Sequence, residues 1–386
     1  MIPVSSATVR TPRISVVIPT YNRAHYLPLA IDSVLQQTCA DVELIVVDDG
    51  STDDTRERLT AYRDRVTYIA TRNLGAGHAR NVGMRAARGQ YLAFLDSDDL
   101  FYPYMLEVES TLLDLYPDVA MVYAETSAFD DGEFFDRFHL QTYHHSAYRN
   151  PQVTYDRLFD RSVQLGDVSA LRDLLAHEDP TLLERRAYFG NIFSRYLENI
   201  VVFQNNMLMR REVVATVGVR KERVKYYEEL DYILRITRRH RVCFVDVPTY
   251  KLRYHDGQIS TTSRKDGRYV WLRKQQELLH VVKEHAVEDA AYYQEHRVRI
   301  DRHLAHLHRA VAVPLMLADG PARRGRTYAR RARKYLARAA RYGYPHRGLW
   351  LMTFTPGVVR RFGVSLVEYA RMWSHRWAAW SERRAA

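Results

Sequence analysis

The sequence contains little of what secreted, metal-knuckle or membrane-spanning proteins require. Its two cysteines, Cys39 and Cys243, are too few for a secreted disulfide scaffold and lie too far apart to form a metal knuckle. It has no window of about 18 uninterrupted apolar residues, and residues 1–13 lack an apolar run of signal-peptide length. We therefore expect a cytoplasmic protein of a reducing compartment, without a membrane span or an export signal.

Acidic residues are scarce in one region, which makes the charge uneven along the chain. Residues 321–386 hold 16 of the 57 basic residues but only two of the 46 acidic ones. The first 320 residues are therefore slightly acidic, although the net charge of the whole chain is +11. We expect any contact with an anionic membrane or a polyanion to involve the C-terminal stretch. No recognisable nucleic-acid module accompanies this charge, so we expect no nucleic-acid partner.

Short apolar runs alternate with segments of helical spacing in the N-terminal third of the sequence. A hydrophobic content of 46% excludes disordered and collagen-like chains, and 386 residues are long for one core. The alternation indicates right-handed βαβ units and a mostly parallel sheet. The expected strands are residues 14–18, 43–47, 66–70, 91–95 and 119–123, and the expected helices are residues 24–37, 52–62, 77–87 and 103–115.

Carboxylates follow two of the expected strands. Asp48 and Asp49 come after the second strand, and Asp96, Asp98 and Asp99 come after the fourth. Open parallel sheets bind ligands at the carboxyl ends of their strands, so these five acids should gather at one edge. Like charges raise one another's pKa unless a cation neutralises them, and oxygen-rich clusters suit Mg²⁺ or Mn²⁺.

The pattern is less regular after residue 125. Residues 126–199 are rich in Tyr, Phe, His and Arg and predict an irregular insertion with some helix. Regular elements return from residue 200, with a helix expected over about 228–239 and extended segments over 242–254. Beyond residue 262 the sequence is helical and charged.

Four parts of the sequence are informative because of their order and spacing along the chain. They are ISVVIPTYNRAHYLPLAIDSVLQQT, VELIVVDDGSTDDT, NLGAGHARNVGMRAARGQYLAFLDSDD, and EELDYILRI followed by LRYHDGQIS. In their order and spacing they resemble the family 2 glycosyltransferases, which have the GT-A fold. The resemblance covers residues 13–125 well and residues 200–262 moderately.

The resemblance implies an α/β GT-A fold, Rossmann-like, with a mostly parallel sheet flanked by helices and a C-terminal basic helical extension. The implied division is an N-terminal arm (1–13), a catalytic domain (14–262) and a helical extension (263–386, basic from 321). Within the catalytic domain we expect a nucleotide-sugar-binding half (14–125), an insertion (126–199) and an acceptor and catalytic half (200–262).

The resemblance also implies sugar transfer from a nucleotide-sugar with inversion, with UDP favoured and assisted by Mn²⁺ or Mg²⁺. Asp98 matches the family position that coordinates the metal bridging the diphosphate. Asp96 matches the position near the ribose or the metal. The alternative is that these acids only cap the helix beginning near Pro103.

Four further residues match family positions around the nucleotide. Asp49 matches the position that accepts a hydrogen bond from the base, while Pro19 and Tyr21 match positions lining the base pocket. Arg80 matches an arginine near the nucleotide or its phosphates. The alternatives are that residues 48–52 form only an Asx turn and N-cap, and that Arg80 is an ordinary exposed helix arginine.

Inversion needs a carboxylate that removes the proton of the acceptor hydroxyl. Glu229 takes the family position usually filled by Asp and is the first candidate for this base, with Glu228 and Asp231 as rivals. Acids at a helix N-terminus also simply complement its dipole. His255 matches a position that contacts the metal or the diphosphate in some members, or it is a plain hydrogen-bonding residue.

The C-terminal stretch combines arginine with tryptophan. Residues 323–341 predict a basic helix. Near other arginines lie Trp350, Trp373, Trp377 and Trp380, as interfacial anchors on an anionic membrane do, and the last three share a helical face. The alternative is that this face docks on the catalytic domain or on a second subunit. The three histidines within residues 303–308 are expected on a solvated helix face.

These patterns favour a membrane-peripheral glycosyltransferase at the inner face of the cell membrane. Its acceptor would be a glycan or a lipid-linked molecule in polysaccharide or surface glycan biosynthesis. A nucleotidyltransferase is one alternative, but the glycine- and lysine-rich N-terminal signature expected for it is absent. A non-catalytic nucleotide-sugar-binding scaffold is another, and it would be indifferent to Glu229→Gln.

Overall fold

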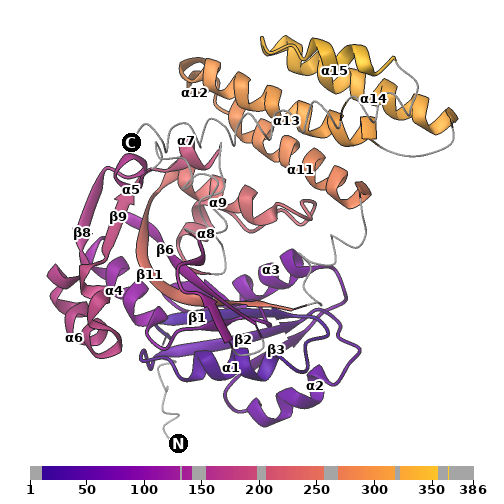
Figure 1. The fold of residues 1–386 in the computed structure, drawn as a ribbon. Helices are drawn as coiled ribbons and strands as arrows, with labels where there is room; N and C mark the ends of the chain where they lie inside the picture. The colour runs from indigo at the N-terminus through magenta and orange to yellow at the C-terminus, as the bar shows by residue number, and fades with distance from the viewer. Residues whose placement is uncertain are drawn as a thin grey trace, which may run out of the picture. The chain divides into compact units, whose positions relative to one another are not determined.

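The chain forms two compact units, residues 1–258 and residues 259–386 (Figure 1). A computed structural model describes residues 11–130, 133–140, 154–197, 206–255, 268–317, 322–354 and 364. The boundary expected after residue 262 falls in the gap between 255 and 268, outside the described residues.

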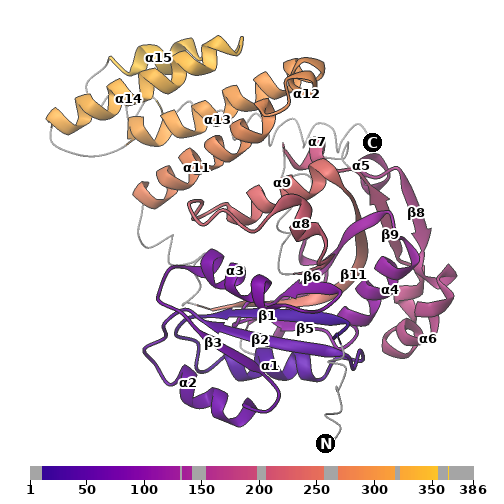
Figure 2. The same cartoon turned by 180° about the vertical axis from the view of Figure 1, so that it is seen from behind.

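The first unit is built on one mixed sheet, which has 11 strands in the described part of the chain (Figure 2). Its main path runs β3-β2-β1-β4-β10-β6-β11-β9-β8, with β5 paired to β11 and β7 paired to β6. The strands are β1 (Ile14–Thr20), β2 (Val42–Asp48), β3 (Thr67–Ala70), β4 (Tyr91–Phe94), β5 (Leu100–Phe101), β6 (Val119–Asp130), β7 (Glu133–Asp136), β8 (Arg161–Gln164), β9 (Arg186–Gly190), β10 (Met207–Arg210) and β11 (Arg241–Tyr254).

The helices of this unit connect the strands and cover the sheet. They are α1 (Leu27–Leu35), α2 (Thr55–Arg58), α3 (Ala76–Ala86), α4 (Met105–Leu115), α5 (Tyr155–Leu158), α6 (Ser169–Glu178), α7 (Phe193–Tyr196), α8 (Val213–Val217) and α9 (Glu228–Arg239). Three short 3₁₀ turns accompany them at Leu59–Tyr62, Leu165–Asp167 and Pro180–Glu184.

The N-terminal half has the expected parallel βαβ arrangement. Strand β1 lies between β2 and β4 and runs parallel to both, and β2 runs parallel to β3. Every residue of β1 is buried, as expected for a short β-branched run covered on both faces. Apolar residues of β1, α1 and α4 share one core cluster, and α3 lies on the other side of the parallel strands from α1 (Figures 1 and 2). The predicted α/β fold class is confirmed.

The register of these strands brings their carboxyl ends to one edge. Thr20 lies opposite Asp48 across β1 and β2, and Asp48 lies opposite Ala70 across β2 and β3. Because the strands are parallel and end together, the loops that follow them meet at the same edge. This register gathers residues that are about 30 positions apart in the sequence.

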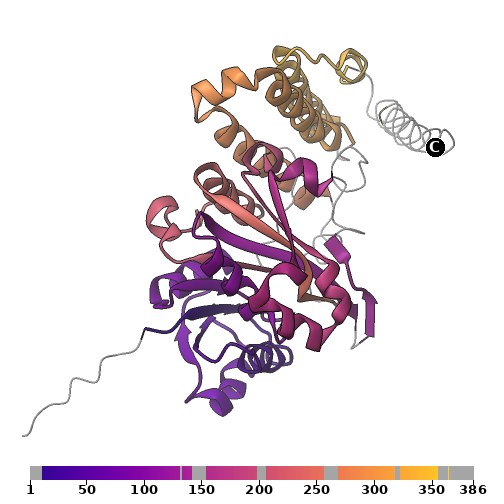
Figure 3. The same cartoon turned by 90° about the vertical axis from the view of Figure 1, so that its left-hand side faces the viewer.

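The second half of the sheet is mixed rather than parallel. Strand β10 runs antiparallel between β4 and β6, and β11 runs parallel to β6 and antiparallel to β9. Seen from the side, the strands cross the unit at changing angles, as in a twisted sheet (Figure 3).

Residues 126–199 contain more regular structure than the sequence predicts. The irregular segment with some helix was expected here, but β6 continues to Asp130 and β7, β8 and β9 join the sheet, with α6 between β8 and β9. The three added strands have four, four and five residues. Strands this short contain too few residues to show a clear alternation of apolar and polar positions.

The second unit is helical in its described part. It comprises α11 (Arg268–Val287), α12 (Ala290–Glu295), α13 (Arg297–Leu317), α14 (Ala322–Arg341) and α15 (Arg347–Met352). Helix α13 packs against both α11 and α14. None of the described helices is long and apolar enough to cross a membrane. Of the four predicted anchors, Trp373, Trp377 and Trp380 lie outside the described residues, and Trp350 is 41% exposed.

One expectation for this unit is wrong. His308 does not face solvent: it is 3% exposed, and its ring stacks on Tyr342 with centroids 5.7 Å apart. Burial lowers the pKa of His308 to about 4, so the imidazole is neutral near pH 7. The predicted solvated face failed because the helix α13 packs on two sides, against α11 and α14.

The close approach of α3 to β1 depends on Gly83. A Cβ at this position would lie 2.2 Å from Val17 Cγ1 and 2.9 Å from Val17 Cγ2. We predict that Gly83→Ala lowers the free energy of unfolding by about 2 kcal/mol, because the added methyl overpacks this contact. Urea unfolding measures the change. Gly348→Ala is the matched control, since nothing lies within 4 Å of a Cβ there. Equal stability of the two variants would contradict the prediction.

Candidate active site

The loops after β1 and β2 are tied together by side-chain hydrogen bonds. Asn22 has a positive φ of 52°, and its Oδ1 accepts a hydrogen bond of 2.8 Å from the Thr52 amide. The Asn22 amide donates in turn to Ser51 Oγ at 2.9 Å. The Ser51 amide donates to Asp48 Oδ1 at 2.8 Å, but residues 48–52 do not cap a helix, because the N-cap of α2 is Asp54. These hydrogen bonds hold the two loops together at the edge of the sheet.

Asp49 organises the loop between β3 and α3. Its Oδ2 accepts from the Gly75 amide at 2.7 Å, and its Oδ1 accepts from the Leu74 amide at 3.0 Å and from Thr71 Oγ1 at 3.1 Å. Pro19 is buried in β1, whereas Tyr21, which follows this strand, is 43% exposed. An exposed aromatic ring is available for stacking, and the base contacts assigned to Pro19, Tyr21 and Asp49 stay predictions.

Arg80 of α3 is buried between two carboxylates. Its Nη2 lies 2.6 Å from Asp96 Oδ1 at the end of β4, and its Nη1 lies 2.8 Å from Glu228 Oε1 at the start of α9. Burial would lower the pKa of Arg80, but the charges of Asp96 and Glu228 raise it. The alternative of an exposed helix arginine is wrong, because Arg80 is 5% exposed.

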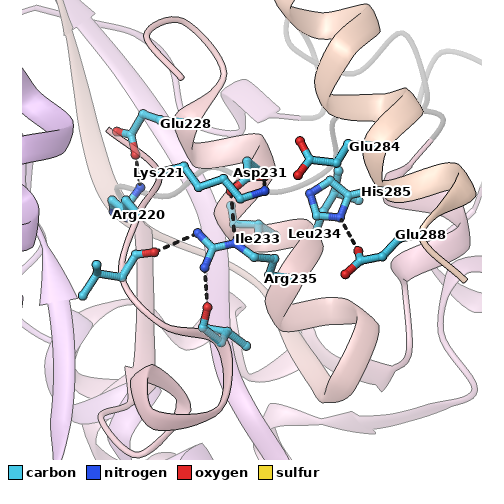
Figure 4. Close-up of polar contacts among 12 residues, drawn as sticks. Arg220, Lys221, Glu228, Asp231, Ile233, Leu234, Arg235, Glu284, His285 and Glu288 are labelled. Carbon is cyan, nitrogen blue, oxygen red and sulfur yellow. Dashed lines mark hydrogen bonds and ion pairs between the residues drawn. The ribbon is translucent and has the colours of Figure 1, made fainter. Parts of the chain in front are cut away.

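Two of the three acids at the start of α9 form ion pairs with arginine or lysine (Figure 4). Glu228 Oε2 accepts from Arg220 Nη1 at 2.9 Å, in addition to the contact with Arg80. Burial opposes ionisation of Glu228, but Arg220 and Arg80 together lower its pKa. Asp231 is fully buried and pairs with Lys221 Nζ at 2.8 Å and Arg235 Nε at 3.0 Å.

Glu229 lies between these paired acids but is not itself paired. Among the described residues, none donates a hydrogen bond to its carboxylate or forms an ion pair with it. Burial raises the pKa of Glu229 to about 7, and the neighbouring charge of Glu228 adds to this effect. A half-buried, unpaired carboxylate with a pKa near neutrality has the properties of a general base.

Asp98 of the loop after β4 faces His255 at the end of β11. Asp98 Oδ2 lies 3.1 Å from His255 Nε2 and 3.2 Å from Arg23 Nε. An open pocket of about 420 Å³ adjoins this pair, and Arg23, Tyr26 and His255 are among its lining residues.

Asp98 and His255 could supply two of the ligands of a divalent cation. A carboxylate oxygen and an imidazole nitrogen are donors that Mn²⁺ accepts. No cluster of three or more His, Cys, Asp or Glu able to hold a metal occurs within the part of the chain that the structure describes. Asp96 turns its Oδ1 toward Arg80. A metal here would therefore need a diphosphate and water to complete its coordination.

Asp99 fixes the acidic loop to β11. The Tyr250 hydroxyl donates to Asp99 Oδ2, and the Arg253 amide donates to Asp99 Oδ1 at 2.7 Å. Burial, reinforced by Asp98 and Asp96, raises the pKa of Asp99 well above its usual range. The alternative that these acids cap a helix is wrong, because α4 begins at Met105 without a side-chain cap.

Sequence reasoning missed the partners of the α9 acids. Arg220 is fully buried, and its guanidinium lies 4.7 Å from the ring centroids of both Phe94 and Tyr232. Arg220 and Lys221 lie in the segment between α8 and α9, where no periodic pattern marks them. The one signal in the sequence was the cluster of three acids at the start of α9, because acids that become buried need cations as partners.

Most of the first unit matches a known protein family. Residues 15–218 match the family described as Glycosyl transferase family 2. An uncharacterized glycosyltransferase of Rickettsia prowazekii is 41% identical over 103 residues, which are 27% of this chain and 32% of that protein. The chondroitin synthase of Escherichia coli is 42% identical over 109 residues, which are 27% of this chain and 16% of that protein.

One solved structure is similar over nearly the whole chain. S. aureus TarS 1-349 has a TM-score of 0.52 at 16% sequence identity, with coverage of 94% of this chain and 92% of that chain. This likeness supports the GT-A fold. The matched segment spans about a third or less of the length of these two curated relatives.

The ion pairs predict that Glu228 contributes to stability and that its neighbour Glu229 does not. We expect Glu228→Gln to lower the free energy of unfolding by about 3 kcal/mol, because it removes a buried negative charge that pairs with both Arg80 and Arg220. Glu229→Gln should cost little or nothing, since none of the described cations forms an ion pair with it. Urea unfolding at pH 7 compares the two variants, and an equal loss in both would contradict the assignment.

Proposed function

The chain belongs to glycosyl transferase family 2, and we propose that it transfers a sugar from a nucleoside-diphosphate sugar to an acceptor hydroxyl with inversion. The observation that carries this proposal is Glu229. Its carboxylate is unpaired, its pKa is raised to about 7, and it adjoins the ion pairs that connect α9 to the end of β4. The paired states of Glu228 and Asp231 support Glu229 over these two rivals.

In this proposal Glu229 takes the proton of the acceptor hydroxyl as that oxygen attacks the anomeric carbon. The bond to the diphosphate breaks on the opposite face of the sugar, and the nucleoside diphosphate leaves with the bonding electrons. Its growing negative charge needs electrostatic stabilisation. Asp98 and His255 would hold Mn²⁺ or Mg²⁺, which when bound supplies positive charge to the diphosphate.

The donor would lie along the sheet edge formed by the loops after β1, β2 and β4. Pro19 and Tyr21 would line the base pocket, Asp49 would accept from the base, and Asp96 would contact the ribose. We propose UDP as the nucleotide because of the family resemblance of these positions. Asp49 supports a base contact in one respect: a carboxylate that already accepts backbone hydrogen bonds is fixed in orientation.

For the acceptor we propose a glycan or a lipid-linked molecule of polysaccharide or surface glycan biosynthesis. One relative of the matched segment is named chondroitin synthase, which is consistent with a glycan acceptor. We further propose that the enzyme is cytoplasmic and works at the inner face of the cell membrane, with the basic region from residue 321 near that surface.

The role of Glu229 predicts a defined pH dependence. The base must be ionised to accept a proton, so kcat should rise with pH through about 7 and then level off. Glu229→Gln should lower kcat by about 10²-fold to 10⁴-fold and leave donor binding unchanged. The matched control is Glu212→Gln, an exposed acid in the segment before α8. Full activity of Glu229→Gln would contradict the assignment of Glu229 as the base, whereas nucleotide-sugar binding without any turnover by wild type would favour a non-catalytic scaffold.

The donor class and the metal site can be tested together. We expect UDP with Mn²⁺ to raise the melting temperature more than GDP, CDP or dTDP, because a ligand that binds only the folded state stabilises it. Asp98→Asn should abolish the metal-dependent part of this shift and weaken Mn²⁺ binding measured by electron paramagnetic resonance. Asp64→Asn, at an exposed residue, is the control. Equal shifts in Asp98→Asn and wild type would exclude Asp98 as a metal ligand.

A further inference from the structure

Helix α14 carries a continuous positive face. Arg330, Lys334, Arg338 and Arg341 are all exposed and follow one another at helical spacing, and we call these four residues the basic face. The sequence of α14 contains no acidic residue. The opposite side of the helix is apolar and buried, through Ala329, Ala332, Leu336 and Ala339. Since α14 packs against α13 through this side, the cations are directed away from that packing.

Helix α15 adds exposed apolar side chains beside α14. Trp350, Leu351 and Phe354 are 41%, 61% and 60% exposed, and we call these three residues the apolar patch. Arg333 of α14 joins the two elements, because its guanidinium lies 4.4 Å from the Phe354 ring centroid and its Nη1 donates to the Thr353 carbonyl at 3.3 Å. Exposed apolar residues on one helix, packed against a second helix that carries a row of cations, mark a surface for a partner with both apolar and anionic groups.

We propose that the basic face and the apolar patch dock the second unit on an anionic phospholipid surface. Lipid headgroups supply the negative charge for the four cations, and the boundary between headgroups and acyl chains accepts the apolar patch. The long Arg and Lys side chains extend to phosphate while their stems remain against the helix.

The same features fit nucleic acid less well. Single-stranded nucleic acid is held by aromatic faces on which bases stack. Here the face of Phe354 is covered by Arg333, and Trp350 meets Phe354 edge to face with centroids 4.9 Å apart. Leu351, the most exposed of the three, offers no stacking surface. An apolar interface needs only exposed apolar edges, which all three residues provide.

The test is binding of the full chain to vesicles. Sedimentation with phosphatidylcholine vesicles, with and without phosphatidylglycerol, should show binding only to the anionic vesicles, and added NaCl should reverse it. Changing all four residues of the basic face to Gln should weaken the partition coefficient by about 100-fold or more, since each cation near an anionic surface contributes about fivefold. Trp350→Ser with Leu351→Ser should weaken binding by about tenfold or more.

A charge-matched control uses four exposed arginines of the first unit, Arg56, Arg58, Arg63 and Arg65. Changing these to Gln removes the same charge and should leave vesicle binding unchanged within about threefold. Circular dichroism of each variant shows whether its helices are retained.

Binding of the basic-face variant as tight as that of wild type would overturn the proposal. Equal binding of wild type to neutral and anionic vesicles would overturn it too. Retention of wild type by single-stranded RNA but not by anionic vesicles would assign the surface to nucleic acid instead. All vesicle measurements are made without nucleotide or metal, so they are independent of the sugar transfer proposed above.

Discussion

The site depends on one buried cation. Arg80 comes from α3, and its two carboxylate partners come from the end of β4 and from the start of α9. A guanidinium that is 5% exposed is stable only while its countercharges stay in place. This requirement joins the parallel half of the sheet to a helix that begins 148 residues further along the chain. The start of α9 is thus held against the loops where the strands end.

The charge balance around Arg80 explains the state of Glu229. Arg80 and Arg220 are two cations, and Asp96 and Glu228 are the two carboxylates that pair with them. Glu229 is a third carboxylate, which forms no ion pair among the described residues, and burial raises its pKa to about 7 although Arg80 and Arg220 lower it. In contrast, Arg220 and Arg80 lower the pKa of the neighbouring Glu228 and favour its ionised form. The network therefore separates one reactive acid from its structural neighbours.

The sequence predicts the elements well and their long-range partners poorly. The β-branched runs of β1 and β2 and the helical spacing of α9 are local patterns, and the structure confirms them. The acids after β2 and β4 could be placed at one edge because parallel strands share a direction. The pairing of Glu228 with Arg220, and the burial of His308, depend on packing between elements. No periodicity of the sequence encodes such contacts.

The contacts made by the end of β11 limit where residues can be inserted or deleted in this chain. Its pairing with β6 contains irregularities around Pro248, after which Tyr250 and Arg253 hold Asp99 and His255 reaches Asp98. Successive side chains of a strand point to opposite faces. One residue inserted or deleted between Pro248 and Tyr254 would exchange the faces of the strand residues beyond it and displace His255, which directly follows the strand, from Asp98. Homologous chains that keep this site should therefore vary in length in their surface loops and keep the spacing of this strand constant.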